Sequence, residues 1–256
     1  MGTVVSFDIR PRGVPHQRTR TALARACTIL HRADEVFSLY KPTSALSRLR
    51  RGALTISACP PEVSEVLDLC HQAYEQSEGW FDPWALGPRV DPTGLVKGWA
   101  ARQAADALAQ DGIGAAMVNA AGDISVFGRP SPMRPWRVGV RAPEAPDRLL
   151  CVVAAESAVA TSGTYERGDH VRDVRTGGPA AAASSATVCG PDLAYADAFA
   201  TGLLAAGDAG LDAVQRAGYE SLIVRPDGSL ASTSGFPFVR ESEPSGAARR
   251  TSSAPP

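Results

Sequence analysis

The chain has 256 residues, of which 44% are hydrophobic, so it carries enough apolar side chains for one sizeable core. Its formal net charge is -1 and its arginines are spread among acidic residues, which argues against a basic surface for nucleic acid. No apolar run approaches the roughly 18 residues of a membrane span, and the first residues do not read as a signal peptide. The five cysteines are scattered and odd in number. We therefore expect a reduced, cytoplasmic protein without a disulfide framework.

The N-terminal part predicts one strand followed by helices. Residues 3–9 alternate in the way of a strand, and residues 17–36 carry an apolar stripe at helical spacing. Residues 37–52 contain Lys-Pro-Thr-Ser and predict a loop with a short helical turn. Two prolines then open a helix that Gly79 is placed to end. Its apolar face is carried by Val63, Val66, Leu67, Cys70 and Tyr74.

The remainder alternates Ala-rich helices with short strands. An Ala-rich helix is predicted over residues 96–110, after a Pro/Gly-rich loop. Strand candidates follow in AAMVNA, DISVFG, WRVGVRA, LLCVVAA and SAVATS. The helices AYADAFATGLLAAG and LDAVQRAG precede a closing strand pair, ESLIVRP and SLAST. This pattern indicates an α+β fold with mostly antiparallel strands. We expect one domain over residues 1–240 and a disordered Ser/Pro/Ala-rich tail over 241–256.

The segment DPTGLVKGWA, residues 91–100, is the first candidate for binding chemistry. Gly94 permits a turn that most residues resist, and Lys97 and Gly98 open the predicted helix. A lysine at a helix N-terminus suits a phosphate or pyrophosphate. An ordinary loop-to-helix junction with a solvated lysine explains the same residues equally well. The glycine spacing of a Walker A loop is missing.

The segment DAFAT, residues 197–201, places a carboxylate and a hydroxyl on one helix face. Asp197 and Thr201 are four residues apart, so they would offer two oxygen ligands to a hard cation such as Mg²⁺. On spacing alone, a capping or solvent-facing Asp197 and a Thr201 bonded to its own helix backbone are the better explanation.

The segment TSGTYERGDHVRDVRTG, residues 161–177, holds a histidine in polar, glycine-flanked surroundings. His170 would serve as a general base near neutral pH, with Asp173 orienting it or stabilising its charge. A structural hydrogen bond of a loop histidine is the alternative. Between these segments, residues 118–128 predict a hairpin with a tight turn, where Asn119 and Asp123 would be able to approach a ligand.

The motifs occur in one order along the chain: FSLY, SALSRL, FDP, DPTGLVKGWA, VNAAGDI, ATSGTYER, HVRDVRTG and DAFAT. This series resembles the ApbE family, the FAD:protein FMN transferases, from Met1 to about Phe238. The resemblance implies an ApbE-like (T-fold-like) α+β domain. It also implies that FAD binds with Mg²⁺, that FMN is transferred to a Ser or Thr of a target flavoprotein, and that AMP leaves.

The resemblance also implies roles for individual residues. Asp197 and Thr201 match the family's metal-binding side chains, and Gly94 matches a residue whose backbone carbonyl completes the metal site. His170 matches the proposed base. Contacts to FAD are expected from Met1, Ser38, Leu39, Tyr40, Phe81, Asp82, Asp91, Lys97, His170 and Val171.

Four residues depart from the family pattern. Ala45 and Arg50 replace a usual Glu and Asn, Ala121 stands in the GGD turn, and Val174 stands where Pro is usual. The metal pair, Lys97 and His170 remain. Two alternatives to transfer therefore stay open: a Mg²⁺-dependent FAD pyrophosphatase with water as the nucleophile, and a protein that binds FAD without turnover.

Overall fold

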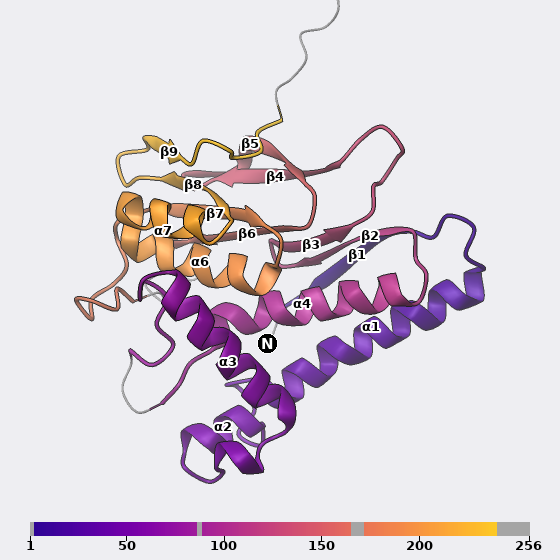
Figure 1. Cartoon of the computed structure of the whole chain (residues 1–256), viewed down its shortest axis with the longest axis horizontal. Helices are drawn as coiled ribbons and strands as arrows, with labels where there is room; N and C mark the ends of the chain where they lie inside the picture. The colour runs from indigo at the N-terminus through magenta and orange to yellow at the C-terminus, as the bar shows by residue number, and fades with distance from the viewer. Residues whose placement is uncertain (1–2, 86–88, 165–171, 240–256) are drawn as a thin grey trace, which may run out of the picture.

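A computed structural model describes residues 3–85, 89–164 and 172–239 of the chain. Over these residues, seven strands form an antiparallel sheet in the order β1-β2-β3-β6-β7-β8-β9 (Figure 1). Its strands are β1 Val5–Arg10, β2 Ala115–Ala120, β3 Asp123–Phe127, β6 Ala158–Gly163, β7 Ser185–Gly190, β8 Glu220–Val224 and β9 Leu230–Ser232. The antiparallel pairing agrees with the α+β expectation.

Two helices lie directly on one face of this sheet (Figure 1). Helix α4, Thr93–Gln110, packs on β2 and β3, and α6, Leu193–Ala206, packs on β6 and β7. Helices α1, His16–Phe37, and α3, Pro61–Gln76, cover this pair from outside. The shorter helices are α2 Ala45–Arg50, α7 Leu211–Arg216 and the 3₁₀ turns Ile56–Ala58 and Gly207–Gly210.

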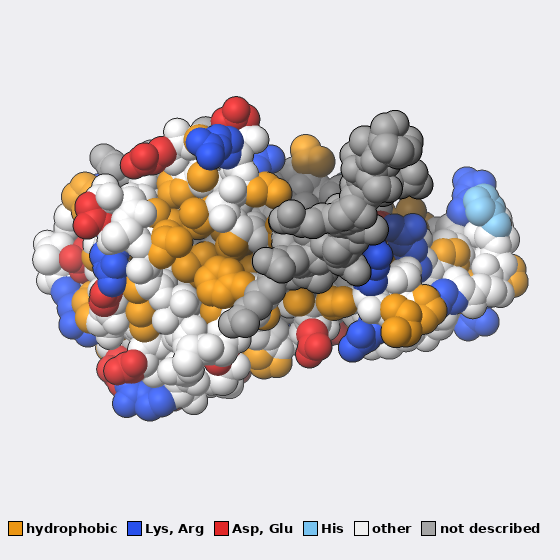
Figure 2. All heavy atoms as spheres, turned by 90° about the horizontal axis from the view of Figure 1, so that it is seen from above, with side chains coloured by type: hydrophobic (Ala, Val, Ile, Leu, Met, Phe, Trp, Pro, Cys, Tyr) orange, Lys and Arg blue, Asp and Glu red, His pale blue; other side chains and the backbone are white. Residues whose placement is uncertain are grey.

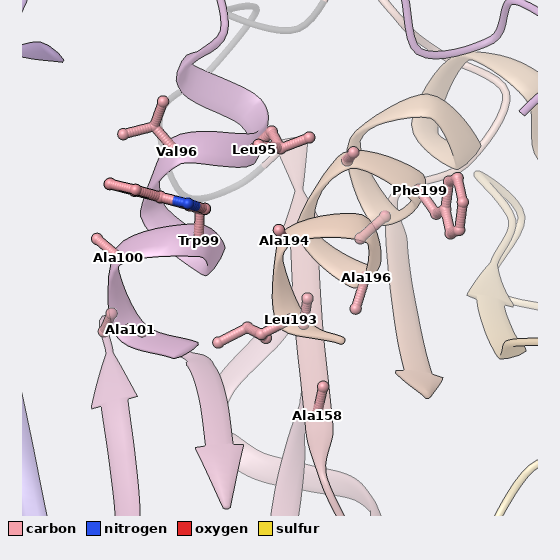
Figure 3. Packing of buried hydrophobic residues seen from close by; sticks show 14 of the residues in the cluster. Leu95, Val96, Trp99, Ala100, Ala101, Ala158, Leu193, Ala194, Ala196 and Phe199 are labelled. Atoms are coloured by element: carbon pink, nitrogen blue, oxygen red, sulfur yellow. The ribbon is translucent and has the colours of Figure 1, made fainter. Parts of the chain in front are cut away.

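The main core lies where α4 and α6 meet each other and the sheet. Figure 3 shows Leu95 of α4 and Leu193 of α6 between the two helices, whereas Trp99 and Phe199 point to their outer sides. Most residues of α6 are buried, and its many alanines leave room for close helix contact. The Asp192 side chain accepts a 2.8 Å hydrogen bond from the Ala194 amide and so caps the start of α6.

A two-stranded sheet of β4, Trp136–Ala142, and β5, Ala145–Ala155, belongs to a second apolar cluster with residues of β3 and β8. Alternate residues of β4 are buried and exposed, as in a sheet with one solvated face. Figure 2 views the molecule from this side and shows exposed hydrophobic side chains among charges of both signs. The large exposed apolar residues of the chain include Met133, Leu149, Leu230 and Phe238.

The turn between β2 and β3 confirms the predicted tight hairpin. Ala121 and Gly122 both have positive φ, 51° and 99°, which suits the two central residues of a primed turn. The Asn119 side chain accepts a 2.8 Å hydrogen bond from the Gly122 amide, so it stabilises the turn.

The structure differs from the prediction at two element boundaries and in one additional strand. Helix α4 starts at Thr93 rather than 96, because the Asp91 carboxylate accepts hydrogen bonds from the Thr93 amide and hydroxyl. Strand β5 starts at Ala145 rather than Leu149. Strand β7, Ser185–Gly190, was not predicted, because it is buried on both faces and lacks the period-two pattern. The predicted tail, 241–256, lies outside the described residues.

Candidate functional site

A cavity of about 430 Å³ opens between the start of α4, α6, β6 and the loops after α1 and α3. A cavity of this size is in the range of small-molecule and cofactor sites. Most of the residues that the sequence singled out line it: Ser38, Leu39, Tyr40, Phe81, Asp82, Asp91, Gly94, Lys97, Asp173, Asp197 and Thr201. Segments far apart in the sequence thus meet at one place.

Asp197 lies at the bottom of the site, on α6, with 3% of its surface exposed. Its Oδ2 accepts a 3.0 Å hydrogen bond from the Gly98 amide of α4. Burial, and then the Asp123 carboxylate, raise the pKa of Asp197 well above its usual value, while Lys97 acts against them. A carboxyl group kept in such surroundings, at the wall of a cavity, is typical of functional sites.

The second carboxylate, Asp123 on β3, is 1% exposed and does not line the cavity. Its Oδ2 lies 2.5 Å from the Nζ of Lys97, and its Oδ1 accepts a 3.2 Å hydrogen bond from the Thr161 amide. Lys97 therefore spans from the cavity wall to a buried acid behind it. The ammonium partly neutralises two acids, which lowers the cost of burying them together.

Thr201 stands one helical turn after Asp197, on the same face of α6, as the spacing predicts. Its hydroxyl lies 3.4 Å from that of Ser162 on β6. A Cβ added to Gly94 would come within 3.2 Å of both Thr201 Oγ1 and a Phe81 ring carbon. The backbone of Gly94 and the hydroxyl of Thr201 are thus close neighbours, and a larger side chain at position 94 would require both to shift.

The loop after α1 forms one wall of the cavity, and side-chain hydroxyls hold its backbone in place. The carbonyl of Ser38 accepts hydrogen bonds from the hydroxyls of Ser44, at 2.7 Å, and Ser47, at 3.1 Å. Tyr40, next along this wall, is 81% exposed, so its ring is available to a ligand or a partner. In the loop after α3, Phe81 is buried and its amide donates to the hydroxyl of Ser77.

Asp173 lines the cavity at the start of a turn over residues 173–178. Its carboxylate accepts hydrogen bonds from the Arg175 amide, at 2.9 Å, and from the Thr176 amide and hydroxyl. The Arg175 amide, together with the Thr176 groups, holds the pKa of Asp173 below its usual value. The predicted role of Asp173 in orienting His170 stays a prediction, because Met1, His170 and Val171 lie outside the described residues.

Several site residues were not found from the sequence. The guanidinium of Arg175 stacks on the ring of Trp80, 3.4 Å from its centroid, and Trp80 lines the cavity. Arg172, Thr161 and Ser162 also line it. Trp80 carried one usable signal, since it directly precedes the FDP segment. Arg172 and the two hydroxyl residues lie in the same segment as His170 and Asp173, where no spacing marks them.

Among the residues that the structure describes, no helix is long and apolar enough to cross a membrane. Similarly, no group of three or more His, Cys, Asp or Glu in the described part of the chain gathers as a metal cluster.

Comparison with known proteins gives consistent matches. The family model described as "ApbE family" matches residues 1–91 and 85–223. A FAD:protein FMN transferase of Vibrio cholerae is 32% identical over 130 residues, covering 46% of this chain but only 39% of that relative. One of Chlamydia pneumoniae is 27% identical over 238 residues, covering 68% of this chain and 73% of the relative. A solved structure of the flavin transferase ApbE from Vibrio cholerae matches with a TM-score of 0.77 at 23% identity, over 93% of this chain and 96% of that one.

Proposed function

The chain belongs to the ApbE family, and from that premise we propose that it is an FAD:protein FMN transferase. In the proposed reaction a Ser or Thr hydroxyl of a target flavoprotein attacks the FMN phosphorus of FAD. A new P–O bond forms to the hydroxyl oxygen, the P–O bond to the bridging oxygen of the diphosphate breaks, and AMP leaves. The cavity described above is the proposed FAD site.

The observation that carries this proposal is the charge of the cavity wall. Four carboxylates among its described residues, Asp82, Asp91, Asp173 and Asp197, face two cationic side chains, Lys97 and Arg172. Arg50 pairs with Asp91 from outside the cavity and Lys97 pairs with the buried Asp123, so the described wall offers little unpaired positive charge to a diphosphate. An additional cation would therefore favour the binding of an anionic dinucleotide here.

The residues present fit Mg²⁺ as that cation. Asp197 supplies a buried carboxylate, and the hydroxyl of Thr201 lies beside the backbone of Gly94. Oxygen atoms of these three residues are the ligand type that Mg²⁺ prefers, with the remaining positions left to phosphate and water. When bound, Mg²⁺ would neutralise charge on the diphosphate and polarise the attacked phosphorus.

The chain's own residues supply the remaining requirements of phosphoryl transfer. Lys97 carries a positive charge at the second turn of α4, facing the cavity, where it would hold a phosphate oxygen. The wall with Tyr40 and the buried Phe81 would enclose the rings of the dinucleotide. His170 is the proposed acceptor of the hydroxyl proton, in keeping with the family resemblance.

The test is to incubate the protein with FAD, Mg²⁺ and a flavoprotein that carries an acceptor Ser or Thr. AMP is followed by chromatography and covalently bound flavin by in-gel fluorescence. We expect AMP and labelled acceptor in equal amounts, and neither with EDTA. AMP with free FMN would instead identify a pyrophosphatase, and tight FAD binding without AMP a flavin-binding protein.

A matched pair of variants makes the metal assignment testable. Asp197→Asn should reduce Mg²⁺-dependent turnover by about a hundredfold or more, because it removes the charged ligand. Asp212→Asn removes one acid from the exposed face of α7 and should leave turnover unchanged. Equal activity of the two variants would contradict the metal site.

A further inference from the structure

Helix α2 contacts two walls of the cavity that are about fifty residues apart in the sequence. From its N-terminal end, Ser44 and Ser47 donate hydrogen bonds to the carbonyl of Ser38. From its C-terminal end, Nη1 of Arg50 lies 3.3 Å from the carbonyl oxygen of Val90 and 3.2 Å from Oδ2 of Asp91. This one short helix thus connects two parts of the cavity. One is the loop after α1 that carries Ser38, called the Ser38 wall below, and the other is the loop that leads into α4.

Asp91 links Arg50 to the start of α4. Its Oδ1 accepts hydrogen bonds from the amide and the hydroxyl of Thr93, at 3.1 and 2.7 Å, while its Oδ2 faces Arg50. The carboxylate therefore fixes the first turn of α4, and Arg50 fixes the carboxylate. Gly94 and Lys97, which face the cavity, lie in the first two turns of the same helix.

We propose that Arg50 is a positioning residue that holds the start of α4 at its working distance from the Ser38 wall and so sets the width of the nucleotide site. Arg50 does not line the cavity, so it acts through Val90 and Asp91 rather than by touching the ligand. The identity of the ligand as FAD rests on the proposed function. The role of Arg50 in placing the two walls is independent of the proposed function.

The strength of the ion pair alone would not make Arg50 important. Both side chains are about one quarter exposed, and pairs with this exposure contribute little to stability. Its effect comes from geometry: the guanidinium holds a backbone carbonyl and a capping carboxylate together, and a small misplacement of a binding group weakens a site. We therefore expect a larger effect on ligand affinity than on unfolding.

The experiment compares three variants of the full chain. Arg50→Ala removes both contacts. Arg50→Lys keeps the charge and can restore the ion pair. Arg48→Ala removes the same charge from an exposed position on the same helix and serves as the control. FAD affinity is measured by quenching of flavin fluorescence in Mg²⁺, and amide hydrogen exchange is measured without any ligand.

The expected result is a Kd for FAD raised about fivefold in Arg50→Ala, an intermediate value in Arg50→Lys and an unchanged value in Arg48→Ala. In the ligand-free protein, amide hydrogen exchange in Arg50→Ala should be faster than in the wild type at residues 38–41 and 93–97, and unchanged in α6. Equal losses of FAD affinity in Arg50→Ala and Arg48→Ala would mean that only the positive charge of Arg50 affects binding, and this would overturn the proposal. Unchanged exchange at both walls would also overturn it. If the wild-type protein fails to bind FAD, the proposed function falls, while the exchange measurement still decides the role of Arg50.

Discussion

Gly98 and Asp197 meet where α4 crosses α6, and the contact leaves no room for a side chain at position 98. The Gly98 amide donates to the Asp197 carboxylate at 3.0 Å. A Cβ at position 98 would lie 3.0 Å from the Cβ of Asp197 and 2.3 Å from the carbonyl oxygen of Leu193. The absence of a side chain is thus what allows the backbone of one helix to hold the acid of the other.

Gly98→Ala should therefore push α4 and α6 apart, because the closest clash is with backbone. We expect a loss of about 3 kcal/mol or more in the free energy of unfolding, at the upper end for overpacked cores. Urea unfolding measures it. Gly178→Ala is the control, since its Cβ would meet only Thr176 Oγ1 at 3.5 Å. Equal midpoints for the two variants would show that the helices can separate without cost.

Asp197→Asn should make the metal-free protein more stable at neutral and alkaline pH. Because the folded-state pKa of Asp197 is raised, the folded protein binds a proton more tightly than the unfolded chain does. Its stabilising contribution is present below the unfolded pKa of about 3.9 and is lost as pH rises through the folded value. The asparagine keeps the Gly98 hydrogen bond without the buried charge.

We expect a gain of about 1–2 kcal/mol at pH 8, with the melting temperature rising by about 2–4 °C per kcal/mol. Melting temperatures of both proteins in EDTA between pH 4 and pH 8 test this. The acids with lowered pKa values, such as Asp173 and Asp208, are common to both proteins, so they cancel in the difference. If the difference in melting temperature between the two proteins does not grow with pH, the pKa of Asp197 is not raised in the folded protein.

The chain's local patterns predicted most of its elements and part of the site. The four-residue spacing placed Asp197 and Thr201 on one face, and the structure has both at the cavity. By contrast, the buried partners of this pair depend on which strands meet which helices. Asp123 reaches Lys97 only because β3 lies under α4, and Arg50 reaches Asp91 only because α2 folds back on the loop before α4. Such contacts carry no local signal in a single sequence.

The stacking of Arg175 on Trp80 should be measurable as a coupling energy. The contact joins the turn over residues 173–178 to the cavity wall. In a double-mutant cycle of Trp80→Leu and Arg175→Ala, we expect about 0.5–1 kcal/mol of coupling in the free energy of unfolding. Trp80→Phe retains a π face and should keep part of it. Strictly additive losses would mean that the two side chains do not stabilise each other.

The thiols of Cys70 and Cys189 should resist modification in the folded protein. Burial raises the pKa of each to about 12, so hardly any reactive thiolate exists at pH 8. Mass spectrometry after timed treatment with iodoacetamide should find both unmodified until the protein is unfolded in urea. Cys27 is partly exposed and is the internal comparison. Labelling of Cys70 at the rate of Cys27 would contradict the buried position.

Lys97 pairs with the buried Asp123, and its proposed role towards the nucleotide should be separable from that contact. Lys97→Met should cost about 3–5 kcal/mol of stability, because it leaves Asp123 as an uncompensated buried charge beside Asp197. Adding Asp123→Asn removes that charge, so the double variant should regain most of the loss in urea unfolding. FAD affinity should stay low in the double variant, because the ammonium that would hold a phosphate oxygen is still missing. Recovery of both stability and affinity would instead mean that Lys97 serves only to neutralise Asp123.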